Sequence, residues 1–247
     1  ISSYWRQILD QQASAGAVEL QKAAALYFVS ADGTSLLGEV RNIAIREWDL
    51  AAYANLLVEE LSKGATQIEG ALRVMPSSDY LQRNPVLLSE ERIIELYFGE
   101  EIDSFLMLSG YTRGMLLSSL CYTLSSFIPR FGGLIAYVNG EKVTEVELMD
   151  GSRWQSPSGL MTRESIAPLA ADTCTVYFPL ADGSGLRAAI RPIAQRHRTQ
   201  PRALMRELMK EPNDPTLSRA LPEGVSDADI LGLQIVGDTA LVDQRRV

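Results

Sequence analysis

The sequence predicts an α+β protein made of two tandem copies of one module, each a mainly antiparallel sheet with helices packed on one face. Three observations predict this class: a short motif that occurs twice, helix and strand patterns that follow it in the same order, and short strands separated by helices at uneven spacing. The chain of 247 residues is long enough for two domains of ordinary size.

The repeat begins with "LYFVSADG" at residue 26 and "VYFPLADG" at residue 176, which are 150 positions apart. In both copies an apolar strand leads into Asp-Gly, a dipeptide typical of tight turns because glycine tolerates positive φ. The same offset relates residues 32–45 to residues 182–195. Each copy is therefore expected to open with a strand, a turn and a less regular extended segment.

A helix is expected next in each copy. Residues 56–65 match residues 203–212 at an offset of 147, and apolar residues recur at helical spacing along both segments. Gly64 and Pro212 are the expected helix stops. One face of each helix is therefore expected to be buried and the charged face to be wet.

Alternating patterns then predict a β-hairpin in each copy. Residues 92–108 are expected to turn at Gly-Glu (99–100), and residues 230–243 at Gly-Asp (237–238). The match between the two copies continues as far as these segments.

Beyond the hairpins the copies differ. The first continues with an expected helix at 113–127 and a strand at 134–140, and an Asn-Gly turn leads to a returning strand at 141–148. The second copy has four residues left after Asp243, so its closing helix and strand are expected to be missing. A trimmed chain end, or another segment that fills the gap, would account for this, and an amphipathic helix at 3–12 is one candidate.

The expected division of the chain has four parts: an N-terminal helical segment at 1–23, a first module at 24–148, an irregular linker at 149–172, and a C-terminally incomplete second module at 173–247. Ser-Pro-Ser-Gly at 156–159 and Pro168 mark the linker as irregular.

The matched segments resemble the GerM domain family, which is named for a sporulation and spore-germination lipoprotein. The resemblance is carried by "LYFVSADGTSL", "LLVEELSKGA", "MPSS", "CYTLSSF" and "IAYVNGEKV" in the first copy, and by "VYFPLADGSGL", "ALMRELMKEP" and "LPEGVSD" in the second. It covers most of 24–148 and 174–243. The chain departs from the family's Gly-Pro helix stop, which reads "GA" in one copy and "EP" in the other.

The resemblance implies a fold like that of ring-building modules, and self-association or scaffold assembly as the mode of action. It also implies an exported protein, extracytoplasmic and held to the membrane as a lipoprotein by an N-terminal anchor that this chain does not contain. The place would be the cell surface or the intermembrane space of the forespore. Its role would lie in sporulation or spore germination.

Composition bears on the class of partner. The net charge is −8, from 31 acidic and 23 basic residues, and no basic stripe is present, so nucleic acid is not an expected partner. The nearest approach to a basic patch is residues 191–202, expected to be a solvated loop leading into a helix, with contact to an acidic partner or lipid head groups as the alternative. It contains Arg191, Arg196, Arg198 and Arg202. No window is apolar for the ~18 residues that a spanning helix needs. The chain opens on Ile1, so a removed leader or tag is expected.

Residue types that carry chemistry are sparse, and no catalytic, metal or cofactor-binding residue is predicted. His197 is the only histidine, which excludes a two-histidine zinc motif, and it is expected to be a surface residue. Cys121 and Cys174 are expected to be separately buried free thiols. Paired carboxylates occur at 89–95, 99–103 and 226–229, without the spacing of a calcium loop.

Adjacent aromatic pairs lie on three predicted strands, so one ring of each pair should face inward and one outward. Core packing is the first expectation for them, and an outward ring that lines an interface or a groove is the alternative. The pairs are Tyr27-Phe28, Tyr97-Phe98 and Tyr177-Phe178. Trp48 is expected to pack against the first long helix.

The leading functional hypothesis is a non-enzymatic, extracytoplasmic structural or interaction protein of the cell envelope. Its mechanism would be contact with a protein partner, or with further copies of itself, through an exposed sheet face or strand edge. The alternative is a module that binds an envelope ligand or glycan in a groove between the two copies. A hydrolase is kept as a third class, because carboxylate geometry is invisible in a sequence.

Overall fold

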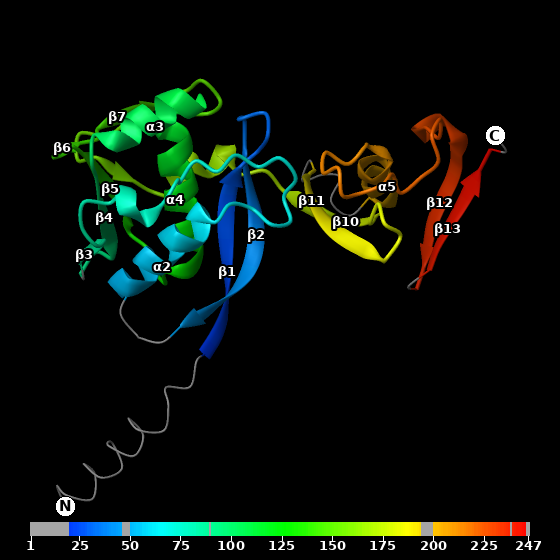
Figure 1. Ribbon diagram of the computed structural model, residues 1–247, viewed down its shortest axis with the longest axis horizontal. Coiled ribbons are helices and arrows are strands. Elements are labelled where there is room, and N and C mark those ends of the chain that lie inside the picture. The colour runs from blue at the N-terminus through cyan, green and yellow to red at the C-terminus, as the bar shows by residue number, and fades with distance from the viewer. Residues whose placement is uncertain (1–19, 46–49, 89, 194–199, 238, 246–247) are drawn as a thin grey trace, which may run out of the picture.

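A computed structural model of the chain describes residues 20–45, 50–88, 90–193, 200–237 and 239–245. It confirms the predicted α+β class, with several small sheets and a few helices that form two units side by side (Figure 1). Module 1 runs from β1 to the 3-10 helix η2, and module 2 from β10 to β13. Four predictions fall outside the described residues: the helix at 3–12, Trp48, His197, and the arginines at 196 and 198.

Module 1 opens with an antiparallel hairpin and a helix, as its sequence predicts. The segment expected to be less regular is a full strand, because it pairs with the first strand along its whole length. These elements are β1 (Leu20–Val29), β2 (Leu36–Ile45) and α2 (Leu50–Ser62). Gly64 lies two residues beyond the helix at φ +78°, a backbone conformation that favours glycine.

The hairpin predicted at 92–108 is wrong. Its first half is strand β4 (Ile93–Phe98), but its second half is helix α3 (Glu101–Ser109). Ile102 and Leu106 are buried four positions apart on one face of that helix. Acidic residues in its first turn favour a helix start, because they complement the partial positive charge of a helix N-terminus. Alternation over a few residues could not distinguish this pattern from a strand.

Because a helix replaces the returning strand, β4 pairs in parallel with the next strand of the sheet, β5 (Gly133–Val138). The connection runs through α3 and α4 (Arg113–Phe127), and α4 matches the predicted helix residue for residue. The sheet has the order β3-β4-β5-β6, with β3 at Val86–Leu88 and β6 at Glu141–Lys142. Its other pairings are antiparallel.

The predicted Asn-Gly turn is confirmed between β5 and β6, with both of its residues at positive φ. The returning strand predicted at 141–148 is divided, because its second part pairs with a different strand. The parts are β6 and β7 (Glu145–Glu147), and the new partner is β8 (Arg153–Gln155).

The segment expected to be a linker contributes to the core of module 1. It forms β8, β9 (Leu160–Met161), which pairs with β5, and η2 (Glu164–Leu169). Trp154, Met161 and Ile166 are all buried in the main hydrophobic cluster. The Ser-Pro-Ser-Gly segment at 156–159 forms the turn between β8 and β9, whereas Pro168 lies inside η2.

Module 2 repeats the opening of module 1. Its elements are β10 (Thr173–Pro179), β11 (Leu186–Pro192), α5 (Pro201–Met209), η4 (Asp227–Asp229), β12 (Ile230–Val236) and β13 (Thr239–Gln244). The last two strands form the hairpin predicted at 230–243. The pairing of Phe28 with Leu37 recurs 150 positions later as Phe178 with Arg187, so the two opening hairpins have the same register.

The two cores differ greatly in size. In module 1, α4 is buried over almost its whole length and lies between the β1–β2 hairpin and the β4–β5 sheet. The core cluster of module 2 is small, centred on Phe178 and closed on one side by α5. Across the described part of the chain, no helix combines the length and apolarity needed to cross a membrane.

Candidate functional site

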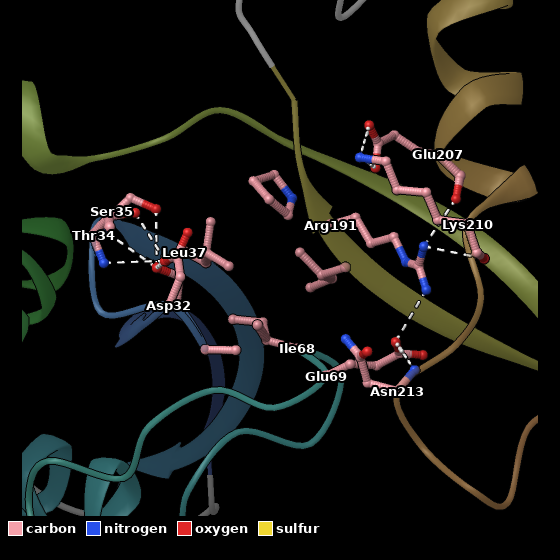
Figure 2. Close-up of a pocket in the computed structure, with 14 residues that line it drawn as sticks. Asp32, Thr34, Ser35, Leu37, Ile68, Glu69, Arg191, Glu207, Lys210 and Asn213 are labelled. Carbon is pink, nitrogen blue, oxygen red and sulfur yellow. Dashed lines mark hydrogen bonds and ion pairs between the residues drawn. The ribbon is translucent and has the colours of Figure 1, made fainter.

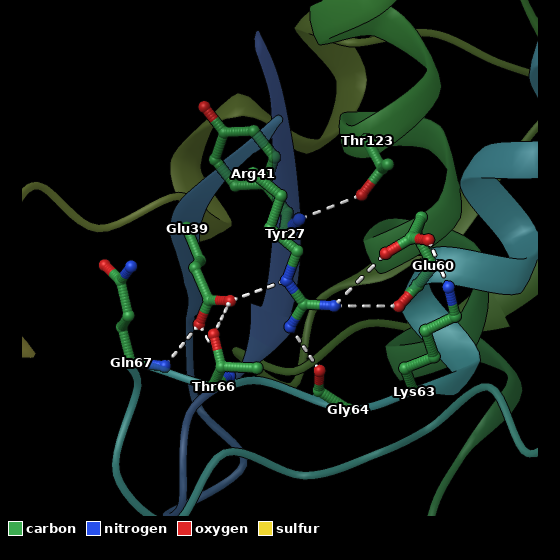
Figure 3. A network of polar contacts seen from close by, with 9 residues as sticks. All are labelled: Tyr27, Glu39, Arg41, Glu60, Lys63, Gly64, Thr66, Gln67 and Thr123. Carbon is green, nitrogen blue, oxygen red and sulfur yellow. Dashed lines mark hydrogen bonds and ion pairs between the residues drawn. The ribbon is translucent and has the colours of Figure 1, made fainter. Parts of the chain in front are cut away.

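The outer edge of β1 is covered by hydroxyl side chains of α4. The Tyr27 N–H donates to Thr123 Oγ1 at 2.9 Å (Figure 3). The Ser119 hydroxyl donates to the Tyr27 carbonyl at 2.6 Å. The Ser126 hydroxyl donates to the Ala25 carbonyl at 2.6 Å. An exposed strand edge offers a row of unpaired backbone groups, and here a helix satisfies them in place of a further strand.

The three hydroxyl residues lie on one face of α4 because they are spaced by four and then three positions. The helix runs antiparallel to β1, since Ser119 meets Tyr27 and Ser126 meets Ala25. Beside these hydrogen bonds the Tyr122 ring meets the Tyr27 ring edge-on, with centroids 4.7 Å apart. The contact between α4 and β1 therefore combines hydrogen bonds to the backbone of the strand with aromatic packing.

Module 2 has the same strand, and within the described residues the same edge is open. Tyr177, the counterpart of Tyr27, is 58% exposed, and Leu186 is 67% exposed although its counterpart Leu36 is fully buried. The hairpin turns differ in the same way. A Cβ on Gly33 would lie 3.0 Å from the Met115 side chain of α4, whereas one on Gly183 would meet nothing within 4 Å.

Tyr177 stands opposite Ala188 at the register position where Tyr27 stands opposite Gly38, so its N–H and C=O point away from β11. Among the described residues, no hydrogen bond reaches these two groups or the equivalent groups of Thr175. The described part of module 2 therefore presents an open strand edge next to exposed apolar side chains. We call this surface the β10 edge; it comprises Thr175, Tyr177 and Leu186.

A second distinctive feature is the joint between the modules (Figure 2). Arg191 of β11 pairs with Glu69 of module 1 at 3.1 Å, and their side chains are 7% and 8% exposed. The same Glu69 oxygen accepts the Asn213 N–H at 3.0 Å. Next to this pair, the Ile190 N–H donates to the Gln67 carbonyl at 2.8 Å, so both backbone and side chains connect the modules.

The joint repeats an arrangement found within module 1. Arg41 reaches the carbonyls of Glu60 and Gly64 at the end of α2, and 150 positions later Arg191 reaches the carbonyls of Glu207 and Glu211 at the end of α5. Such contacts satisfy carbonyls that have no partner within the helix.

The carboxylate partner comes from a different place in the two copies. Arg41 pairs with Glu39 at 2.7 Å, and Glu39 also accepts the Thr66 and Gln67 N–H groups (Figure 3). Alanine stands at the position equivalent to Glu39 in module 2, residue 189. There Glu69 reaches across from module 1 and supplies the missing carboxylate. Module 2 therefore depends on module 1 for one of its own structural interactions.

Two hollows flank this ion pair, with volumes of about 420 Å³ and about 310 Å³. Among the described residues that line these hollows none is aromatic, although the groove hypothesis expected outward aromatics there. Most of the polar lining is already paired, since Asp32 binds Thr34 and Lys210 binds Glu207. Glu69 Oε1 is the exception, because it is buried without a partner among the described residues.

The predicted free thiols are confirmed, one in each module. Burial raises the pKa of the Cys121 thiol strongly and that of the Cys174 thiol in the same direction. The thiolate is the nucleophilic form, so neither cysteine is arranged for nucleophilic chemistry at neutral pH.

The paired carboxylates are not brought together into a cleft. Glu100 and Glu101 lie at the start of α3. Asp227 is held by Arg206 and Arg202, whose hydrogen bonds lower its pKa to about 2. No group of histidine, cysteine and carboxylate side chains in the described ranges has the arrangement of a metal site.

The aromatic pairs follow the predicted alternation, with the second ring of each pair buried. The outward rings have three different environments. Tyr27 is covered by α4, and Tyr97 stacks on Tyr137 with centroids 4.6 Å apart, beneath the Arg83 guanidinium. Tyr177 remains exposed. Of the three, it is the one available to a partner.

Sequence reasoning missed the hydroxyl face of α4 and the role of Glu69. The serine and threonine spacing was visible at 119, 123 and 126, but only the strand edge beside it gives that spacing a meaning. For Glu69 a signal existed in the alignment of the copies. Glu39 of the first copy corresponds to Ala189 of the second, while Arg41 corresponds to Arg191. Arg191 therefore required a carboxylate partner from another part of the chain.

The chain was compared with protein-family models, curated proteins and solved structures. The fold is similar to the solved structure of the tandem GerMN domains of the sporulation protein GerM from Bacillus subtilis, with 15% sequence identity, a TM-score of 0.40, and coverage of 90% of this chain and 78% of that chain. No family model matches the sequence. No curated protein matches it either. The GerM resemblance therefore continues to rest on the sequence motifs.

Proposed function

We propose that the protein is a non-enzymatic interaction protein that binds a protein partner through the β10 edge of module 2. The observation that carries the proposal is the contrast between the two copies. Tyr27 and Leu36 are covered in module 1, while Tyr177 and Leu186 are exposed at the same positions of module 2. Apolar side chains beside unpaired strand groups mark a surface that gains stability when it is covered.

Module 1 is the support for this surface. Its large core and its buried ion pair to module 2 hold the β10–β11 hairpin in place. Module 2 has a second group of exposed apolar residues, on β12 and β13. It consists of Leu231, Ile235, Val236 and Leu241.

The sequence resemblance to the GerM family supports a place for this interaction. It favours an exported, lipid-anchored protein at the envelope of a spore-forming cell, acting in sporulation or germination, and assembly with a partner or with further copies of itself. The anchor and the location are part of the proposal.

Site-specific photo-crosslinking in cells that make the protein tests the proposal. A benzophenone amino acid is placed at position 177, and at position 108 as the control, because Leu108 is 84% exposed on module 1. The proposal predicts a discrete crosslinked protein from position 177 and none, or a different set, from position 108. Equal and diffuse products from both positions would contradict it.

A second candidate function uses the hollow of about 420 Å³ at the joint. The buried, unpartnered Glu69 Oε1 favours it, because a buried carboxylate oxygen gains from an N–H or O–H donor. An amine or a sugar hydroxyl would suit this oxygen. NMR titration with amino sugars and disaccharides tests it, and shifts at Glu69 and Asn213 are expected. An unchanged spectrum at millimolar ligand would remove this candidate.

A further inference from the structure

The β10 edge has a counterpart in module 1 whose occupant is known, and this identifies the kind of partner that fits. We infer that the β10 edge binds a partner helix that carries serine or threonine at positions i, i+4 and i+7. This inference rests on the proposed function and specifies its partner. The helix would lie antiparallel to β10, with its hydroxyl groups on the backbone of Thr175 and Tyr177.

The first support is that the β10 edge and the outer edge of β1 are structurally equivalent. The hairpins have identical register, and each rests on a helix whose end is held by the equivalent arginine. In module 1 the outward groups of Ala25 and Tyr27 bind three hydroxyls of one helix. The same groups of Thr175 and Tyr177 point outward in module 2. A helix with the α4 pattern therefore meets the donors and acceptors that α4 itself meets.

The second support is that the β10 edge is poorly suited to a β-strand, the usual occupant of an open edge. The next outward position after Tyr177 is Pro179, which has no N–H to donate. The Pro179 carbonyl is already used, because it accepts the Ser218 N–H at 2.8 Å. An added strand would lose its ladder there. A helix needs only Thr175 and Tyr177, whose outward groups have no partner among the described residues.

The third support is the space beside the edge. Tyr177 is exposed where module 1 places Tyr122 of α4 against Tyr27, and the turn at Gly183 has open space where Met115 lies against Gly33. Leu186 is exposed as well, whereas its counterpart Leu36 is buried beside Ala170 and Ala171. The partner helix is therefore expected to carry an aromatic residue next to its middle hydroxyl, at the position that Tyr122 has in α4.

The test uses the full chain and a synthetic probe with the sequence of residues 113–127, with lysines added for solubility and C121S to prevent oxidation. The matched control is the same peptide with S119A, T123V and S126A, which keeps size and apolar character but removes the three hydroxyls. Fluorescence anisotropy measures the affinity of each. The probe is expected to bind at least about tenfold more tightly than the control, because each hydrogen bond contributes a factor of several.

Two protein variants locate the binding. Tyr177→Pro removes the outward N–H without touching the β10–β11 ladder, and Tyr177→Ser removes the ring but keeps the N–H. The proline variant is expected to bind the probe about five- to tenfold more weakly than the serine variant. Continued protection of Cys174 from thiol reagents shows that both variants remain folded.

Several results would overturn the inference. The inference is wrong if the probe and the control peptide bind with equal affinity. It is also wrong if the Tyr177→Pro and Tyr177→Ser variants bind the probe equally well. A Tyr177-dependent rise in mass across a concentration series would assign the edge to a second copy. Tighter probe binding after removal of residues 1–19 would assign it to that segment. If any of these results occurs while position 177 still crosslinks to one protein in cells, the inference of a partner helix is wrong and the proposed function is supported. If the probe binds but position 177 gives no discrete crosslink, the proposed function fails.

Discussion

Glu69→Gln is expected to loosen module 2 while leaving module 1 intact. The change keeps the size of the side chain and removes its charge. Glu69 Oε2 accepts two hydrogen bonds, from Arg191 at 3.1 Å and from the Asn213 N–H at 3.0 Å. A hydrogen bond to a charged group contributes about 1 kcal/mol more than a neutral one, so two of them give a loss of about 2 kcal/mol. Both side chains are more than nine-tenths buried, so solvent screening does not reduce this value.

The two buried cysteines provide the assay, because each module contains one. Cys174 stands opposite Arg191 in the β10–β11 pairing, so it reports opening at the joint, and Cys121 reports opening of module 1. A loss of about 2 kcal/mol predicts thiol labelling of Cys174 about thirtyfold faster, with Cys121 unchanged.

The matched control for this variant is Asp103→Asn, the same chemical change at a half-exposed arginine pair of module 1. Exposed pairs contribute at most about 1 kcal/mol, so Cys174 labelling should not respond to it. A Cys174 rate within about threefold of the wild type in Glu69→Gln would refute the structural role of the joint. Equal acceleration of both cysteines would refute its assignment to module 2.

Three further predictions concern individual residues. Gly114→Ala should destabilise module 1 by about 3 kcal/mol in urea unfolding, because its Cβ would lie 2.0 Å from the Glu147 carbonyl oxygen; unchanged stability would contradict this close approach. Ser118→Ala should stabilise module 1 by about 1 kcal/mol in the same assay, since its buried hydroxyl has no partner among the described residues, and a loss of stability would reveal one. Asp227 should titrate near pH 2 by carbon NMR, because hydrogen bonds from Arg206 and then Arg202 lower its pKa from 3.8. Its lowered pKa means that the stability it contributes is present above pH 3.8 and is lost as the pH falls towards 2; a midpoint near 3.8 would contradict the contact.

Much of the fold could be predicted because the two copies of the repeat can be checked against each other. Segments that match across 150 positions must satisfy the same local rules twice, which is why both opening hairpins and both first helices were found. The helix α4 was found because its apolar run is long and its ends are marked. Thr112 caps its start by accepting the Met115 N–H.

Failures occurred where the two copies diverge or where pairing partners are distant in sequence. Residues 101–109 alternate over too short a span to separate a helix from a strand, and only packing decides. The short strands β8 and β9 exist because they pair with β7 and β5, so their own residues carry little signal. The candidate site could not be located from the sequence, since the β10 edge is defined by what covers the equivalent edge of module 1.

The most direct measurement compares backbone hydrogen exchange at Tyr27 and Tyr177, the same position in the two copies. The Tyr27 amide donates to Thr123 and is expected to be protected. The Tyr177 amide should exchange close to its intrinsic rate in the protein alone, and become protected when the helical probe is added. Equal protection of both amides in the protein alone would show that the β10 edge is already covered, and would contradict the account of module 2 as the binding surface.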